Sequence, residues 1–344
     1  MRRRPIRFRV LVVSLLALPA LTACADRQQR DVALPDCLDL DAVYAVTGPE
    51  SVGVFSWTEA QDLAAELDSS AAAGFPEAPL TVFGPGEESG TFDSFTELAI
   101  EPIAEQRGVE EGNQLPRPDY ISSPNDNVII DGVAGTPGSF GWVGHAFATE
   151  NDATVRTFAV AGEDGRCVAP TDAAIASGEY PLARDLYIYV NAERAAEDEE
   201  VMAYVDSYLG TVGYEAVADA GYVQLDDAAW AAVAERWADV GGRPGEPATE
   251  VTGDVSVSGS STVEPVSSLV AERFSTDNPT AGVSVDGPGT GDGFELFCAG
   301  DTDISDASRP IEPEEAEACE ANGIDYVELK VAIDGLSLVT RSAA

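Results

Sequence analysis

The order of hydrophobic and polar positions switches repeatedly along the chain between two patterns. Short apolar runs of strand type, such as APLTVFG at residues 78–84 and LYIYV at residues 186–190, are followed by stretches with helical spacing. SWTEAQDLAAEL and SGTFDSFTELAIEPIAEQRG are two of these predicted helices. Since strands that alternate with helices across glycine-rich turns are typical of α/β folds, we expect an α/β protein.

The pattern continues in the second half of the chain and is interrupted once. Residues 127–150 predict a helix, a glycine-rich turn and an aromatic strand, and residues 198–225 predict two helices and a closing strand. Residues 241–254, rich in Gly, Pro and acidic residues, predict a linker. The pattern of strand, turn and helix then restarts at residue 255 and runs to a predicted strand in residues 331–344.

The N-terminal residues have the pattern of an export signal. Five arginines precede an apolar run that is too short to span a membrane comfortably. The run ends in LTAC, which has the form of a lipobox, although an ordinary signal peptide with a chance cysteine is the alternative. We expect residues 1–23 to be a lipoprotein signal peptide, Cys24 to carry the lipid and residues 24–35 to form a tether. The protein is then anchored at the extracytoplasmic face of the cell membrane.

The composition makes the mature chain strongly acidic. The sequence has 19 basic and 61 acidic residues and a formal net charge of -42. Removal of residues 1–23, which hold five arginines and no acidic residue, leaves 14 basic residues against 61 acidic ones, a net charge of -47. This charge excludes nucleic acid and anionic lipid as partners of the folded body, so the lipid on Cys24 is the expected contact with the membrane.

Four cysteines remain when Cys24 is set aside: Cys37, Cys167, Cys298 and Cys319. An even number of cysteines in an exported protein indicates two disulfides. Three pairings are possible from the sequence.

Three turns made of Gly, Ser and Thr lie where a predicted strand passes into a helix, at residues 258–263, 289–293 and 89–92. The first N–H groups of a helix lack internal partners and carry positive potential, so such turns can bind an oxyanion. Each turn alone is more typical of an ordinary helix cap, and the occurrence of three such turns is what favours a binding site. A fourth segment, DISDASRP, places Asp306 and Arg309 just after a strand, where open α/β sheets bind ligands. A surface ion pair is the alternative for these two residues.

The sequence does not favour a catalytic or metal site. His145 is the only histidine, and its GWVGHAF setting is typical of a packed or capping residue rather than a general base. No glycine–serine–glycine turn of esterase type occurs, and no spacing of zinc or calcium ligands. We expect no enzymatic activity, no cofactor and no bound metal.

Seven segments resemble the phosphate-binding proteins of Pst-type ABC importers: SGSSTVEP, GTGDGFELFC, DISDASRPI, AIDGLSLV, PLTVFGPGEESGTFDSF, NDNVIIDGVAGTPGSFGWVG and YPLARDLYIYV. They cover most of residues 37–225 and nearly all of residues 255–340, and the combination of SGTFDSF with DISDASRPI is specific. The resemblance implies a two-lobed periplasmic-binding-protein-like fold of class II. Each lobe is then a mixed β-sheet flanked by helices, and the ligand lies in the cleft between the lobes.

The family's order of segments is rotated in this chain. In the family the SGSST segment comes first and the SGTFD segment follows the DGL strand, whereas here SGTFD precedes both. We therefore expect a circularly permuted chain whose linker joins the usual end to the usual start. A gene assembled from parts of two copies is the alternative. The expected lobes are lobe two, residues 36–180 with a return strand at residues 334–344, and lobe one, residues 181–240 and 255–333, with the linker at residues 241–254.

The resemblance implies that phosphate is held mainly by hydrogen bonds. The matching positions are Ser261, Thr262, Val263, Thr290, Gly291, Asp306, Ser89, Gly90 and Thr91. Asp306 matches the acidic ligand of the family, because a buried carboxylate tolerates an oxyanion when that ligand donates a proton, which phosphate retains at neutral pH and sulfate does not. One branch of the family has an arginine shortly before SGT that residues 83–88 lack, and we expect Arg309 to replace it.

The implied lobes also favour one disulfide pairing. Cys298 and Cys319 fall in lobe one and Cys37 and Cys167 in lobe two, and pairing within each lobe leaves the hinge free to close. The expected partners are inorganic phosphate and the permease subunits of an ABC importer, with the protein itself a monomer. A phosphate sensor or scavenger without a transport role and a receptor for another tetrahedral oxyanion are the alternatives.

Overall fold

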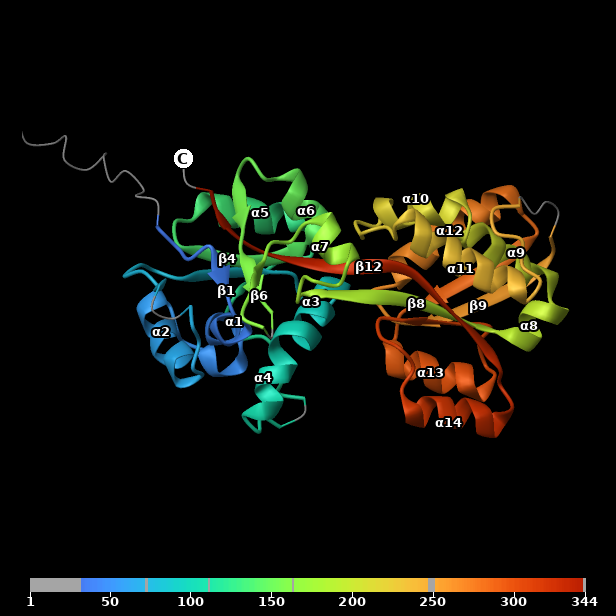
Figure 1. Ribbon diagram of the computed structural model, residues 1–344, viewed down its shortest axis with the longest axis horizontal. Coiled ribbons are helices and arrows are strands. Elements are labelled where there is room, and N and C mark those ends of the chain that lie inside the picture. Colours follow the sequence, from blue (N-terminus) through green and yellow to red (C-terminus); the bar gives the residue numbers. More distant parts are fainter. Residues whose placement is uncertain (1–31, 72–73, 111, 163, 247–250, 343–344) are drawn as a thin grey trace, which may run out of the picture. The chain divides into compact units, whose positions relative to one another are not determined.

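The computed structural model describes residues 32–71, 74–110, 112–162, 164–246 and 251–342 (Figure 1). The predicted signal peptide, the predicted lipidation site Cys24 and most of the predicted tether lie outside the described residues, as do residues 247–250 of the predicted linker. In the described part of the chain, no helix is both long and apolar enough to cross a membrane.

The first half of the chain forms short strands and helices that make up the predicted lobe two. They are β1 (Cys37–Leu38), α1 (Leu40–Thr47), α2 (Trp57–Glu66), β2 (Thr81–Gly84), α3 (Gly90–Phe95), α4 (Glu101–Gln106), β3 (Ile121–Ser122), α5 (Asp126–Gly135), β4 (Ser139–Gly144), α6 (His145–Glu150), β5 (Val155–Thr157), β6 (Ala159–Ala161), β7 (Cys167–Val168) and α7 (Asp172–Ala176). A π-helical turn at Thr96–Ile100 joins α3 to α4.

The second half has longer elements. They are β8 (Ala183–Asn191), α8 (Ala192–Glu197), α9 (Glu199–Tyr208), α10 (Thr211–Asp219), α11 (Asp227–Asp239), β9 (Gly253–Gly259), α12 (Glu264–Asp277), β10 (Ala281–Asp286), α13 (Thr290–Ala299), β11 (Ile304–Ala307), α14 (Pro313–Asn322) and β12 (Tyr326–Arg341).

A nine-stranded sheet runs through the described residues in the order β10-β9-β11-β8-β12-β4-β2-β3, with β5 paired to β12 beside this path. β9 is parallel to β10 and β11, whereas β8 is antiparallel to β11 and β12. The long strand β12 pairs with β8 from Tyr326 to Gly335 and with β4 from Leu336 to Val339. β12 therefore passes from one group of helices and strands to the other, as Figure 1 shows.

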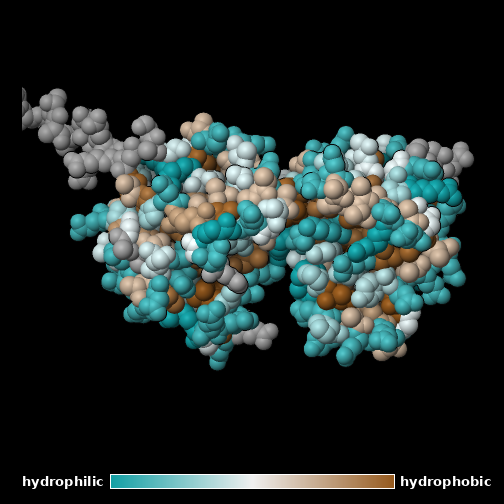
Figure 2. Space-filling view, viewed as in Figure 1, coloured by the Kyte–Doolittle hydropathy of each residue, from teal (hydrophilic) through white to brown (hydrophobic). Residues whose placement is uncertain are grey.

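Two main hydrophobic cores pack against this sheet. The first contains Trp57, Phe95 and Trp142, and the second contains Tyr204 and Leu329 among its buried residues. The partly buried Trp230 of α11 packs against both cores. On the face drawn in Figure 2, hydrophilic residues cover most of the surface, in keeping with the acidic composition.

The predicted closing strand at the end of residues 198–225 does not form, and this expectation is wrong. Val223 makes one antiparallel bridge with Ile333, with N–H···O bonds of 2.9 Å in both directions. From Leu336 onward β12 pairs with β4, so the contact with Val223 stays limited to one residue.

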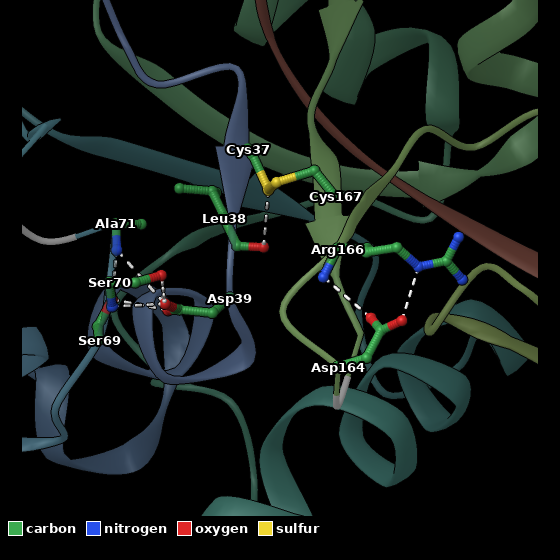
Figure 3. The surroundings of a disulfide bond; sticks show 9 residues. All are labelled: Cys37, Leu38, Asp39, Ser69, Ser70, Ala71, Asp164, Arg166 and Cys167. Carbon is green, nitrogen blue, oxygen red and sulfur yellow. Dashed lines mark hydrogen bonds and ion pairs between the residues drawn. A yellow bond between two sulfur atoms is a disulfide. The ribbon is translucent and has the colours of Figure 1, made fainter.

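Both disulfides have the expected pairing, which is confirmed. Cys37 of β1 is bonded to Cys167 of β7, with a Cα–Cα distance of 5.9 Å (Figure 3). Cys298 of α13 is bonded to Cys319 of α14, with a Cα–Cα distance of 4.2 Å. Each bond joins two elements of the same predicted lobe, so neither bond restrains one lobe against the other.

Candidate anion-binding site

The first of the three predicted corners follows β9 and requires a glycine. Gly259 has a φ of +148°, and a Cβ at this position would lie 2.0 Å from the carbonyl oxygen of Asp306. The Ser260 N–H donates to that carbonyl at 2.8 Å, and the Ser260 hydroxyl accepts from the Thr262 N–H at 3.2 Å. The Val263 N–H donates to the Ser260 carbonyl at 3.0 Å, which argues against the predicted role of Val263 as a donor to a ligand.

The second corner is the N-terminus of α13. Gly293 lies directly against Gly259, because a Cβ at Gly293 would be 2.4 Å from the Gly259 Cα. The Thr290 hydroxyl is 3.0 Å from the Ser308 hydroxyl and accepts a hydrogen bond of 3.2 Å from the Ser308 N–H. The close approach of the two glycines therefore holds Thr290 beside the first corner.

The third corner belongs to lobe two and touches the first directly. Ser89 caps α3, since its hydroxyl accepts from the Thr91 N–H at 3.2 Å. A Cβ at Gly90 would lie 2.9 Å from the Thr262 Cα, and the Thr262 hydroxyl donates to the Gly90 carbonyl at 3.4 Å. Corners that are far apart in the sequence thus meet at Thr262.

Two adjoining cavities lie along these corners. One has a volume of about 480 Å³ and its lining includes Ser260, Ser261, Thr262, Thr290 and Ser308. The other has a volume of about 380 Å³ and its lining includes Ser89, Gly90, Thr91 and Ser261. Glu88, Ser261 and Glu264 line both cavities. The predicted ligands Val263, Gly291 and Asp306 line neither.

Carboxylates also line the larger cavity. They are Glu87, Glu88, Asp93, Glu97 and Glu264. Because like charges repel, an oxyanion that enters this cavity must meet carboxylates that are paired, protonated or displaced.

Asp306 of β11 pairs with Gly259 of the first corner and is completely buried. Its Oδ1 accepts a hydrogen bond of 2.9 Å from the Ser267 hydroxyl, and its Oδ2 has no hydrogen-bond partner among the described residues. Burial raises the pKa of Asp306 to about 8, with a smaller lowering effect from the Ser267 hydrogen bond and a raising effect from the Glu264 charge. At neutral pH this carboxyl group therefore holds a proton in the structure as it stands, which sequence reasoning did not anticipate.

Arg309 is engaged within lobe one. Its Nη1 and Nη2 donate to the two carboxylate oxygens of Glu315 at 2.8 Å, and its Nε lies 3.3 Å from Glu312. Its guanidinium carbon lies 5.8 Å from the ring centroid of Phe294. Arg309 lines neither of the two cavities, so its role as a ligand stays a prediction.

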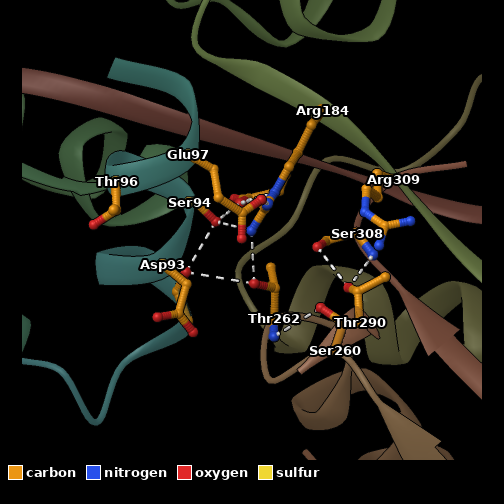
Figure 4. A network of polar contacts seen from close by, with 12 residues as sticks. Asp93, Ser94, Thr96, Glu97, Arg184, Ser260, Thr262, Thr290, Ser308 and Arg309 are labelled. Atoms are coloured by element: carbon orange, nitrogen blue, oxygen red, sulfur yellow. Dashed lines mark hydrogen bonds and ion pairs between the residues drawn. The ribbon is translucent and has the colours of Figure 1, made fainter. Parts of the chain in front are cut away.

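Arg184, which the sequence analysis did not name, is the arginine that contacts the corners (Figure 4). Its Nη2 donates to the Ser94 hydroxyl at 2.6 Å and to the Thr262 hydroxyl at 2.8 Å. Its Nη1 pairs with Glu97, and its Nε lies 3.7 Å from Asp334. The side chain is 8% exposed, so this positive charge is nearly buried between the two lobes. Like Arg309, Arg184 lines neither cavity, but its partners Thr262 and Glu97 line the larger one.

The sequence contains only an indirect signal for the pairing of Arg184 with Asp334. Arg184 is the second residue of β8 and pairs in register with Asp334 of β12. Opposite charges at the ends of two otherwise apolar strands, YPLARDLYIYV and AIDGLSLV, are the signal that could have identified this pair. Burial raises the pKa of Asp334 and that of Glu97, while the charge of Arg184 lowers both in part.

His145 is buried between three elements, as its sequence setting predicts. Its Nδ1 lies 3.2 Å from the Ser337 hydroxyl and its Nε2 lies 3.0 Å from Asp172. Ser337 is completely buried in β12, so this arrangement links α6, α7 and β12 rather than presenting a nucleophile.

Comparisons with known proteins agree with this geometry. The family described as PBP superfamily domain matches residues 44–209 and 244–344. Protein SphX of Synechococcus elongatus is 34% identical over 164 residues, which are 47% of this chain and 45% of that protein. The phosphate-binding protein PstS of Staphylococcus haemolyticus is 44% identical over 89 residues, 26% of this chain and 28% of that protein. The chain thus spans less than half the length of these two curated relatives.

A solved structure shows the same fold. It is the phosphate-binding protein of a phosphate ABC transporter from Streptococcus pneumoniae, with a TM-score of 0.57, 18% identity, and coverage of 76% of this chain and 89% of that one. The predicted fold class and the predicted resemblance to PstS-type proteins are both confirmed. Since the family match extends over most of its length, the chain belongs to the PBP superfamily domain family.

Proposed function

We propose that this protein is an extracytoplasmic substrate-binding protein that captures inorganic phosphate for an ABC importer. The observation that carries the proposal is the meeting of hydroxyl-bearing corners from both lobes at Thr262. The first of these corners is hydrogen-bonded to the backbone carbonyl of the completely buried Asp306. The names of its relatives support the same ligand, since they include phosphate-binding proteins.

The chemistry of the proposed site depends on one shared proton. With the pKa of Asp306 raised to about 8, either the carboxyl group or a bound hydrogen phosphate can supply the proton of the hydrogen bond between them. Sulfate has no such proton at neutral pH, so it depends on the carboxyl group remaining protonated. Selectivity for phosphate over sulfate should therefore increase as the pH rises above about 8.

The proposed lipid anchor at Cys24 lies outside the described residues, and the proposed partners are other proteins, the permease subunits of an importer. The lipobox at Cys24 supports attachment to the outer face of the membrane, and the family supports permease subunits as partners. We keep both as parts of the proposal, together with the monomeric state and the absence of catalysis.

The rotated order of segments is also part of the proposal, with the predicted lobe boundaries. One observation supports it. The Arg156 side chain donates to the carbonyls of Leu34 and Pro35 at 3.0 and 3.1 Å, while its backbone pairs with Thr340 in β12. The segment before β1 and the end of β12 therefore lie against the same residue, where a direct connection in the family's usual order would run.

Calorimetric titration of the full-length protein with phosphate, arsenate and sulfate at pH 9 tests this function. Phosphate and arsenate should bind once per chain, and sulfate should bind roughly 100-fold more weakly, because it leaves a buried carboxylate facing an anion without a proton between them. Absence of phosphate binding, or equal affinity for sulfate at this pH, would rule out the proposal.

A further inference from the structure

The donors of the proposed site and the carboxylates around it come largely from opposite lobes. Ser261 and Thr262 belong to lobe one, whereas Asp93 and Glu97 follow the third corner in lobe two. The inference drawn from this arrangement rests on the proposed function, because it concerns the carboxylates that a bound phosphate would have to displace from these donors.

Asp93 accepts a hydrogen bond from Ser261, one of the residues predicted to donate to phosphate. The Ser261 hydroxyl donates to the Asp93 Oδ2 at 2.5 Å, which is a short, charge-assisted hydrogen bond. An oxyanion offers the same kind of acceptor as this carboxylate. The hydroxyl of Ser261 therefore cannot serve the ligand and Asp93 at the same time.

In the same way, the Glu97 carboxylate forms an ion pair with the buried guanidinium of Arg184. It pairs with the Nη1 of Arg184, whose Nη2 is bonded to Thr262 at the meeting point of the corners. Figure 4 shows Glu97 beside Arg184. The Glu97 side chain is 43% exposed against 8% for Arg184, so Glu97 is the partner that can move away into solvent.

The two carboxylates form one unit. Asp93 and Glu97 are four residues apart across α3 and the following π-helical turn, a spacing that places side chains on the same helix face. Both carboxylates therefore travel together with lobe two when the lobes separate or close.

We propose that Asp93 and Glu97 form a carboxylate latch, which holds Ser261 and Arg184 across the interlobe contact and competes with phosphate for them. In this account Arg184, rather than Arg309, supplies the cation of the anion site. Phosphate binding then requires that the two carboxylates give up their donors, and the latch keeps the affinity below what the donors alone would allow.

The opposite role for Glu97 makes a distinct prediction. A carboxylate that only orients Arg184 toward the anion would strengthen binding, and its removal would weaken phosphate affinity. The sign of the change in affinity therefore separates a competitor from a positioning residue.

The test compares phosphate titrations of the full-length protein and its Glu97→Gln, Asp93→Asn and Glu105→Gln variants. Glu105 is an exposed acid of α4, eight residues beyond Glu97, so its variant removes the same charge without touching the latch. Glu97→Gln and Asp93→Asn should each lower the Kd for phosphate by roughly twofold to fivefold, the scale of one partly exposed ion pair. Glu105→Gln should leave the Kd unchanged.

A second comparison removes the donor instead of the competitor. In a Ser261→Ala background, Asp93→Asn should no longer improve phosphate binding, because the contact that it relieves is already gone. Normal phosphate binding by the unmodified protein combined with unchanged or weaker binding by both latch variants would overturn the latch and leave the proposed function intact. An equal gain in the Glu105→Gln variant would also overturn it, as an effect of net charge. If neither the unmodified protein nor the latch variants bind phosphate, the proposed function itself fails.

Discussion

Asp306 is the side chain of the site with the least usual environment, because its carboxyl group is completely buried and accepts one hydrogen bond, from Ser267. Burial disfavours the charged form and raises the pKa to about 8, from an ordinary value of 3.8. Between these two pH values the folded protein holds a proton that the unfolded chain has lost. The stabilising contribution of the protonated carboxyl is therefore complete below about pH 4 and is lost as the pH rises to about 8.

The Asp306→Asn variant, which is uncharged at every pH, should reveal this contribution. The free energy of unfolding of the unmodified protein, relative to that of the variant, should fall between pH 4 and pH 8 by at most about 1.4 kcal/mol per pH unit. Urea unfolding at a series of pH values measures the difference. Parallel curves for the two proteins would show that Asp306 titrates normally.

At the residue scale, sequence reasoning could name Asp306 and the hydroxyl corners as candidates but could not point to Arg184, which contacts the corners. Arg309 lies three residues after Asp306 in the DISDASRPI segment, whereas Arg184 lies far away in the sequence and reaches Thr262 only because β8 crosses between the lobes. Nothing in the local pattern shows that Glu315 would hold the guanidinium of Arg309, since that contact depends on where α14 begins.

At the element scale, the strands and helices beside the site follow from the hydrophobic pattern and from two glycines. The φ of Gly259 and the contact between Gly293 and Gly259 fix how α13 sits on the end of β9. The closing strand at Val223 could not be excluded from the sequence, because its partner β12 pairs with β4 nearby. α11 was not named either, although Asp226 caps it by accepting from the Ala229 N–H at 2.8 Å.

The order of the elements carries a prediction of its own. A chain that starts at Val251, joins Arg341 to Val32 through a short glycine–serine linker and ends at Glu246 restores the family's usual order. It should keep both disulfides and the phosphate affinity, with a free energy of unfolding that differs by roughly 1 kcal/mol or less, because loop closure costs little.

Disulfide mapping by mass spectrometry, urea unfolding and phosphate titration check this reordered chain. Failure to fold, in a preparation where the unmodified protein folds, would mean that the segments before β1 and after β12 are not suitably placed for a connection. In that case the alternative of two partial gene copies would gain support.

At the scale of the described body, two cores are connected by β8 and β12 and held together at the corners by Ser261, Thr262 and Arg184. Both disulfides lie within a predicted lobe, so they stabilise each lobe and leave the movement between lobes unrestrained. This division was predictable because the family resemblance supplied the lobes. The direct contact of Asp93 and Glu97 with the donors was not, since the sequence shows those acids only as polar positions of a helix.

The central claim is that the three corners bind one tetrahedral oxyanion between them. Crystals of the protein grown with one equivalent of arsenate, measured at the arsenic absorption edge, locate that anion directly. We expect a single anomalous peak between Thr262, Thr290 and the segment Ser89–Thr91, within hydrogen-bonding reach of Asp306. A peak elsewhere on the protein would contradict the account. So would the absence of a peak in crystals grown from a solution in which the protein is saturated with arsenate.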